Sequence, residues 1–344
     1  MAQTLFRQSF LYDSLNLDNE MPEKQVQLPS GPTIRVLKRG VVEVIPYQVT
    51  NDTKSIVLSA GIHGDETAPM ELLDKLVGDI IEKRVTVNHR CLFLYAHLQA
   101  TNQHTRFIDE NLNRLFDNKP HSKESLETKI ADGLKETLTK FFEGTQEKQR
   151  WHLDLHCAIR GSKHYTFAVS PKVAKAQSRS RELIEFIEKA KVEAVLLSNA
   201  PAATFSWYSA ECFCAQALTM ELGKVSPLGE NDLSLISGFD DALRALLSDE
   251  LDRVDAVPLV TYRVTQTIKR LTDDFDFNFS DDVENFTQFE HGQVLGHDGE
   301  KLLFAKVEQE AIVFPNKNVA LGQRAALMVS PVETWYQDDQ LVYD

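Results

Sequence analysis

The stretch that decides the fold is KSIVLSAGIHGDETAPMELLDKLVGDII, residues 54–81. Its first part, KSIVLSA, is a short apolar run typical of a buried parallel strand. Glycines then allow a sharp turn, and residues 68–81 repeat apolar side chains at helical spacing. The order strand, turn, helix predicts an α/β unit. It also places His63 and Glu66 at the carboxyl end of a strand, where open α/β sheets bind their ligands.

Strand and helix patterns alternate from this stretch to residue 249. The predicted strands cover 55–60, 91–98, 151–156, 165–170, 193–198 and 216–222. The predicted helices lie near 67–83, 123–142, 173–190 and 230–249. This alternation predicts a mixed, mostly parallel α/β sheet flanked by helices.

The character of the chain changes near Asp255-Ala-Val-Pro258. The following segments show short strand patterns broken by Gly, Asp, Asn and Pro, without a helix of any length: 261–268, 287–295, 302–307 and 325–329. We therefore expect a catalytic domain over 1–255 and a smaller C-terminal β domain over 256–344. The acidic segment 273–282 is expected to be a loop or an exposed edge because of its charge.

A candidate metal site arises from two of these strand ends. Residues 151–156 (WHLDLH) alternate, so His152, Asp154 and His156 share one face, and His156 ends the strand. Two neutral imidazoles and a carboxylate, here His63, His156 and Glu66, are three ligands of a catalytic zinc with its fourth position open. In a chain with ten histidines, the pattern His-x-x-Glu is expected about once by chance. Taken alone, it could equally be a polar turn that caps the following helix.

Two carboxylates lie near the expected ligands. Asp154 stands two residues before His156 on the same face, where it can orient a ligand imidazole or the bound water. Glu221 ends the apolar run 217–222, and a carboxylate there needs a partner or a function, although a solvated strand end is the commoner explanation. His152 is about 13 Å from His156 at ~3.3 Å per residue, too far to bind the same metal.

Arginines follow the strand at 91–98. Arg106 and Arg114 lie in the loop after it, and Arg114 is preceded by Asn113. Loop arginines are commonly solvated, but an Asn-Arg pair offers planar, multidentate donors that can hold a carboxylate.

The charge distribution indicates the class of ligand. The formal net charge of −14 argues against nucleic acid or an anionic membrane as partner. Cationic or potentially cationic residues nevertheless lie on or just after the site segments: Arg106, Arg114, Arg160, Lys163 and His164. Arg160 and Lys163 either bind substrate or are ordinary solvated side chains of a surface loop. Positive charge gathered around a metal in an acidic protein favours a small polyanionic substrate.

Composition is that of a cytoplasmic enzyme. With 344 residues, 42% of them hydrophobic, the chain can bury a large core. The first residues lack the apolar segment of a signal peptide, and no run approaches the ~20 apolar residues of a membrane span. Four cysteines without a clear disulfide or metal spacing fit a reduced compartment.

Taken together, these motifs resemble the succinylglutamate desuccinylase/aspartoacylase family of amidohydrolases, within the zinc carboxypeptidase fold group. The resemblance spans roughly the first two-thirds of the chain and rests on four motifs: His-Gly-Asp-Glu at 63–66, Arg106 with Asn113-Arg114, Asp-Leu-His at 154–156 and Glu-x-Gly at 221–223. The segment 154–164 is similar to the desuccinylase version of the family. The family usually has Asp-x-Asn-Arg, whereas this chain has Asn111, which can accept the same hydrogen bond from a ligand imidazole but polarises it less.

The resemblance implies an activity and a set of roles. One zinc ion per chain would be held by His63, Glu66 and His156, and the reaction would be hydrolysis of the amide of N-succinyl-L-glutamate to succinate and L-glutamate, a step of bacterial arginine catabolism. Glu221 would be the general base and Arg106 would stabilise the oxyanion. Substrate carboxylates would be held by Asn113, Arg114, Arg160 and Lys163.

Alternatives remain open from the sequence. An aspartoacylase, another N-acyl-amino-acid hydrolase or a peptide metallocarboxypeptidase would keep the zinc chemistry and change the pocket. A non-catalytic anion-binding module is disfavoured because no ligand or base is missing. The sequence leaves open the oligomeric state, the role of the β domain, and whether cobalt or manganese replaces zinc.

Overall fold

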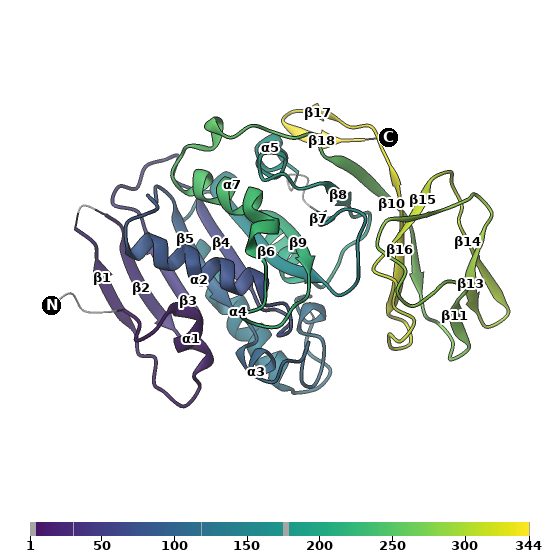
Figure 1. Cartoon of the computed structure of the whole chain (residues 1–344), viewed down its shortest axis with the longest axis horizontal. Helices are drawn as coiled ribbons and strands as arrows, with labels where there is room; N and C mark the ends of the chain where they lie inside the picture. Colours follow the sequence, from purple (N-terminus) through teal and green to yellow (C-terminus); the bar gives the residue numbers. More distant parts are fainter. Residues whose placement is uncertain (1–4, 30, 118, 175–178, 344) are drawn as a thin grey trace.

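The computed structural model describes residues 5–29, 31–117, 119–174 and 179–343, and it shows a helix-flanked sheet continued by a smaller β part (Figure 1). The mixed α/β fold expected from the sequence is confirmed. In sheet order, the strands of the main sheet are β1 (Lys24–Gln27), β2 (Thr33–Lys38), β3 (Val41–Ile45), β5 (Arg90–Tyr95), β4 (Ser55–Ala60), β6 (Arg150–Ala158), β9 (Gln216–Lys224), β7 (Thr166–Ser170), β8 (Ala194–Leu197), β10 (Val260–Lys269), β16 (Arg324–Pro331), β15 (Glu310–Val313) and β12 (Thr287–Phe289).

The centre of this sheet is parallel. β5, β4, β6 and β9 run in one direction, and their register sets Ala60 beside Leu155 and His156 beside Glu221. Because parallel strands end at the same edge, this register brings the ends of β4, β6 and β9 together. The antiparallel strands β1 to β3 at one edge are a feature that the sequence analysis did not anticipate.

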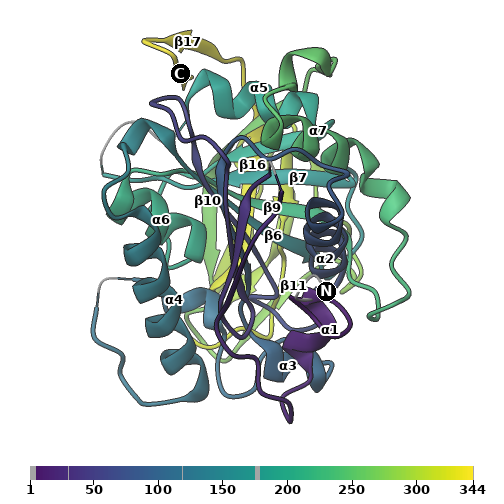
Figure 2. The same cartoon turned by 90° about the vertical axis from the view of Figure 1, so that its left-hand side faces the viewer.

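Helices cover both faces of the sheet (Figure 2). One face is covered by α1 (Phe10–Leu15), α2 (Ala68–Ile81), α5 (Arg181–Lys189) and α7 (Ser237–Leu247). The other is covered by α4 (Leu126–Phe142) and α6 (Phe205–Phe213). Strand β4 shows why two layers form: Ile56 and Leu58 face the first helix layer, and Val57 faces the second. The helices α1, α6 and α3 (Leu98–Asn102) were not predicted from the sequence.

The C-terminal part is built almost entirely of strands. β10 continues the sheet from β8, and a separate three-stranded sheet has the order β11 (Phe275–Phe277), β13 (Val294–Asp298), β14 (Lys301–Phe304). The acidic segment forms the edge strand β11 of this sheet, which fits the expected loop or exposed edge.

The last two strands, β17 (Trp335–Gln337) and β18 (Gln340–Val342), return to the helical part. The side chain of Leu341 is buried in its core, and the backbone amide of Arg181 donates to the carbonyl of Asp339 over 2.7 Å. The boundary between residues 255 and 256 stays a prediction, because the sheet runs across it and the end of the chain crosses back.

An apolar cluster joins the two parts. Phe167 of β7 and Leu196 of β8 pack with Phe286, Val313 and Leu327 from the C-terminal strands. This contact fixes the β part against the strand that neighbours β9. Within the described ranges, the chain has no helix of the length and apolarity that crossing a membrane requires.

Candidate metal centre and active site

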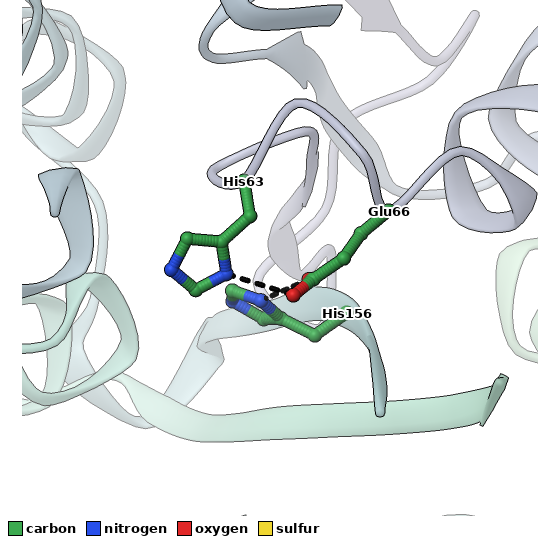
Figure 3. Close-up of side chains that lie close together, drawn as sticks. All are labelled: His63, Glu66 and His156. Atoms are coloured by element: carbon green, nitrogen blue, oxygen red, sulfur yellow. Dashed lines mark hydrogen bonds and ion pairs between the residues drawn. The ribbon is translucent and has the colours of Figure 1, made fainter. Parts of the chain in front are cut away.

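The centre of the site is a cluster of three buried side chains, His63, Glu66 and His156 (Figure 3). His63 and Glu66 lie on the turn between β4 and α2, and His156 lies on β6. The turn depends on Gly64, because a Cβ there would lie 2.3 Å from the carbonyl carbon of Ala100. One potential ligand atom from each of the three residues lies within 4.8 Å of the others.

Both imidazole rings face the Glu66 carboxylate through Nδ1. The distance is 2.8 Å from His63 Nδ1 to Oε1 and 2.7 Å from His156 Nδ1 to Oε2. The structure thus brings together the three residues that the sequence predicted as metal ligands, in an arrangement that could hold a metal ion.

The opposite nitrogen of each ring is already used. His63 Nε2 lies 3.0 Å from Asn111 Oδ1, which also accepts from the backbone N–H of Asn113 and therefore acts as an acceptor. His156 Nε2 lies 3.1 Å from Asp154 Oδ2. Both Nε2 atoms donate, so the Nδ1 of a neutral ring presents a lone pair to the carboxylate.

The lone pairs of two Nδ1 atoms that point at the Glu66 carboxylate repel it, unless a cation lies between them. Two imidazole nitrogens and one carboxylate are the donor set of a catalytic zinc site, so the residues present fit this metal. Burial lowers the pKa of His63 to about 4, which keeps it in the neutral form that binds a metal. At His156 burial opposes protonation, but the carboxylates of Asp154 and Glu66 outweigh it and raise the pKa well above its ordinary value. The negative charge of the two carboxylates favours a positive charge at His156, and either a proton or a metal cation can supply it.

A buried hydrogen-bond network supports His156 from behind. Ser59 donates to Asp154 Oδ1 over 2.6 Å, and its oxygen lies 2.8 Å from His152 Nε2. His152 Nδ1 lies 2.7 Å from Ser209 Oγ. His152 is therefore part of the support of the site and not of the donor cluster. Asp154 and Asn111 are hydrogen-bonded to the imidazoles of His156 and His63, and their role in orienting metal ligands remains a prediction.

Glu221 stands beside this cluster on β9. Its carboxylate is buried, and Oε2 has no hydrogen-bond partner in the described part of the chain. Burial, and then the charge of Glu66, raise the pKa of Glu221 to about 7. A carboxyl group that titrates near neutrality and lacks a partner is suited to exchange a proton with a ligand.

Arg106 also lies at the cluster, because its Nη1 donates to Glu66 Oε1 over 2.6 Å. Asn113 and Arg114 lie on the short 3₁₀ helix η1 (Leu112–Arg114). Asn113 is buried, and its Oδ1 accepts from the backbone amide of Phe205. Desolvation by the surrounding protein, the charge of Arg324 and then that of Arg106 lower the pKa of Arg114 to about 9, although the residue keeps an exposed surface.

The two cations after His156 differ in their contacts. Arg160 Nη1 donates to the backbone carbonyls of Asp281 and Val283 over 2.8 and 3.1 Å, so it ties its loop to the C-terminal part. Lys163 has an exposed side chain. Their roles in binding a substrate remain predictions.

One cation near the site was missed by the sequence analysis. Arg324 opens β16, and burial lowers the pKa of its guanidinium while the carboxylate of Glu221 raises it. The available signal was a single arginine at the start of the apolar run 325–329. That signal is weak because a strand can begin with a solvated arginine.

The chain is similar to known proteins over its full length. The model of the family described as "Succinylglutamate desuccinylase/Aspartoacylase catalytic domain" matches residues 52–247, and that of the "AstE/AspA barrel-sandwich hybrid domain" matches 257–332. The succinylglutamate desuccinylase of Vibrio cholerae serotype O1 is 61% identical over 344 residues, 100% of each chain, and that of Vibrio vulnificus is 56% identical over the same length.

Solved structures show the same relation. The structure of succinylglutamate desuccinylase from Vibrio cholerae matches with a TM-score of 0.97 and 61% identity, covering 99% of this chain and 100% of that one. Murine aminoacylase 3, at 17% identity and a TM-score of 0.56 over 83% of this chain and 97% of that one, shares the fold.

Proposed function

The chain belongs to the succinylglutamate desuccinylase/aspartoacylase family, and on this basis we propose that it is a zinc-dependent amidohydrolase that cleaves N-succinyl-L-glutamate to succinate and L-glutamate. The two Vibrio relatives reported above are named succinylglutamate desuccinylase, and each aligns with this chain over its full length. The proposal includes a cytoplasmic place in the succinyl route of arginine catabolism.

The observation that carries the proposal is the pairing of a three-residue donor cluster with a buried carboxylate, Glu221, one oxygen of which has no hydrogen-bond partner among the described residues. His63, Glu66 and His156 would hold one zinc ion, which when bound polarises the scissile carbonyl and lowers the pKa of water. Glu221 is adjacent to His156 in the strand register and has a free oxygen. A metal site without such a base would fit a structural role equally well.

The residues of the chain have distinct roles in this reaction. Glu221 takes a proton from the attacking water and later delivers it to the nitrogen of the departing glutamate. Arg106 stabilises the negative charge that develops on the carbonyl oxygen, which in comparable enzymes contributes about 3 kcal/mol. Asp154 and Asn111 hold the two imidazoles in the tautomer whose Nδ1 is free to bind the metal.

Asn113 and Arg114 hold a substrate carboxylate. Arg114 has no carboxylate partner among the described residues, and its Nη1 contacts only the neighbouring backbone carbonyl of Asn113. A guanidinium group with donors to spare is suited to bidentate binding of a carboxylate.

Metal analysis combined with a three-substrate assay tests the proposal. We expect one zinc per chain and a clear preference for N-succinylglutamate over N-acetylaspartate and over a dipeptide with a free carboxyl terminus. A preference for N-acetylaspartate would make the protein an aspartoacylase, and a preference for the dipeptide would make it a carboxypeptidase. Cobalt or manganese in the purified protein, in place of zinc, would show that the proposed metal is wrong.

A further inference from the structure

Three arginines lie near the proposed reaction centre, within electrostatic reach of one another or of its carboxylates: Arg106, Arg114 and Arg324, here called the arginine group. Arg106 is paired with Glu66. Arg114 and Arg324 have no ion-pair partner within the described ranges, although the chain holds 51 acidic residues against 37 lysines and arginines. In so acidic a protein, two neighbouring arginines without carboxylates indicate that an anion from outside completes the site.

A chain of contacts brings Arg324 to the site from the C-terminal part. Phe167 of β7 is the Cα partner of Glu221 in the sheet. The ring of Phe167 packs on that of Phe314, with centroids 5.6 Å apart, and the guanidinium carbon of Arg324 lies 5.6 Å from the centroid of Phe314. The start of β16 is thereby held over the strand that neighbours the proposed base.

The charges agree with this placement. The positive charge of Arg324 lowers the pKa of Arg114 more than that of Arg106 does. The negative charge of Glu221 raises the pKa of Arg324. Arg324 therefore lies close to both the proposed carboxylate-binding residue and the proposed base.

The contacts of Arg324 differ from those of a structural arginine. Arg270, in the same part of the chain, donates to the carbonyl of Val319 over 2.9 Å, and Arg160 donates to two carbonyls. The guanidinium of Arg324 lies over the ring of Phe314 and makes no hydrogen bond or ion pair within the described part of the chain. Its hydrogen-bond donors are thus free for a ligand.

The number of cations identifies the half of the substrate that they bind. The positive charges of Arg114 and Arg324 repel each other, and two carboxylates relieve that repulsion better than one. In N-succinylglutamate the glutamate half has two carboxylates and the succinyl half has one. Resting on the proposed function, we propose that Arg324 completes a two-arginine clamp with Arg114 and that this clamp holds the two carboxylates of the glutamate half.

The clamp gives the C-terminal β part a function. It delivers a specificity-determining residue to a reaction centre whose metal ligands and base all come from the other part. The selectivity for a dicarboxylic amino acid then depends on how the two parts are held together.

The experiment compares kcat/KM for four substrates in the metal-loaded wild type and in Arg324→Met and Arg324→Lys. The substrates are N-succinyl-L-glutamate, N-succinyl-L-norvaline without the side-chain carboxylate, N-succinyl-4-aminobutyrate without the α-carboxylate, and N-butyryl-L-glutamate without the succinyl carboxylate. Arg270→Met is the matched control, because it removes an arginine of the same part with structural contacts only.

We expect Arg324→Met to lower kcat/KM at least ~100-fold for N-succinylglutamate and equally for N-butyrylglutamate, because the change leaves a substrate carboxylate without its cation. The loss should disappear with norvaline or with 4-aminobutyrate, whichever analogue lacks the carboxylate that Arg324 binds. The kcat/KM of Arg324→Lys should lie between those of Arg324→Met and the wild type, because lysine keeps the positive charge and loses the planar guanidinium group. Arg270→Met should change all four values by one common factor.

Two results would overturn the clamp. A loss that disappears only with N-butyrylglutamate would assign Arg324 to the succinyl carboxylate, and a loss of equal size with all four substrates would make it a structural residue. Failure of the proposed function looks different. In that case the wild type itself does not cleave N-succinylglutamate, before any variant is compared.

Discussion

The donor cluster and the arginine group lie next to each other and are built in opposite ways. In the donor cluster each imidazole has a hydrogen-bond partner on Nε2, and every ligand comes from the carboxyl ends of neighbouring strands or the turn that follows. In the arginine group, two of three guanidinium groups lack a carboxylate partner in the part of the chain that the structure describes, and the residues come from a loop and from the C-terminal part. On the proposed function, the donor cluster would need only a metal to be complete, and the arginine group would need a substrate.

This difference separates reaction from recognition. A rigid, hydrogen-bonded donor set fixes where the metal lies, whereas unpaired cations bind whichever anion matches their spacing. Substitutions in the donor cluster should abolish turnover for every substrate. Substitutions of Arg114 or Arg324 should change which substrate is preferred.

The largest expected effect is in the donor cluster. His63→Ala or His156→Ala should lose both the metal and turnover, because either change removes one of three protein ligands. Metal content by mass spectrometry and cleavage of N-succinylglutamate measure the two together. If either variant retains stoichiometric zinc and normal turnover, that histidine is not a ligand.

The next effect concerns the base. Glu221→Gln keeps the shape of the side chain and removes its ability to accept a proton, so kcat should fall at least ~100-fold while metal content and KM stay close to wild type. Steady-state kinetics on the metal-loaded variant measures this. A raised KM with unchanged kcat would instead assign Glu221 to substrate binding.

The sequence was sufficient to predict the donor cluster because its signals are local. His63, Glu66 and His156 each follow or end an apolar strand pattern, and parallel strands bring their carboxyl ends to one edge. The main sheet from β4 to β9 and four of the helices were predictable for the same reason, since apolar spacing directly reflects which faces are buried.

The rest depended on contacts that a linear pattern does not contain. Strand β1 (KQVQ) is polar and half-exposed at the sheet edge, so its pattern resembles a loop. Helix α6 (FSWYSAECF) is rich in aromatic and hydroxyl residues and has no clear apolar stripe. Arg324 gains its significance from Phe314, Phe167 and Glu221, which belong to distant segments of the chain.

A smaller effect tests how the succinyl carboxylate is recognised. Arg160→Ala and Lys163→Ala should narrow the preference for N-succinylglutamate over N-acetylglutamate by roughly 10-fold, because an uncharged acyl group leaves these cations unpaired. The measurement is the ratio of kcat/KM for the two substrates. Because Arg160 also ties its loop to the C-terminal part, Lys163→Ala is the cleaner variant. A wild-type ratio near one would contradict selectivity for the succinyl group. A large ratio that is unchanged in both variants would mean that residues other than Arg160 and Lys163 bind the succinyl carboxylate.

The smallest effect on turnover, and a distinct effect on stability, should come from the network behind His156. Burial lowers the pKa of His152 to about 4 from an ordinary value of 6.5. Above pH 6.5 the residue is neutral in both the folded and the unfolded chain, so it does not make stability depend on pH. Between pH 6.5 and about 4 only the unfolded chain takes up the proton, and the free energy of unfolding falls as the pH is lowered.

The variant His152→Gln should remove this dependence. A shift from 6.5 to about 4 corresponds to about 3 kcal/mol when fully expressed, of which roughly half is expressed at pH 5. The drop in Tm between pH 7 and pH 5 should therefore be smaller in His152→Gln than in wild type, while the exposed control His291→Gln keeps the wild-type drop. Glutamine offers both a donor and an acceptor to Ser59 and Ser209, so kcat at pH 7 should change by less than roughly 10-fold. A drop in Tm equal to that of wild type would mean that His152 takes up its proton in the folded protein, and that the network supports His156 with a charged histidine.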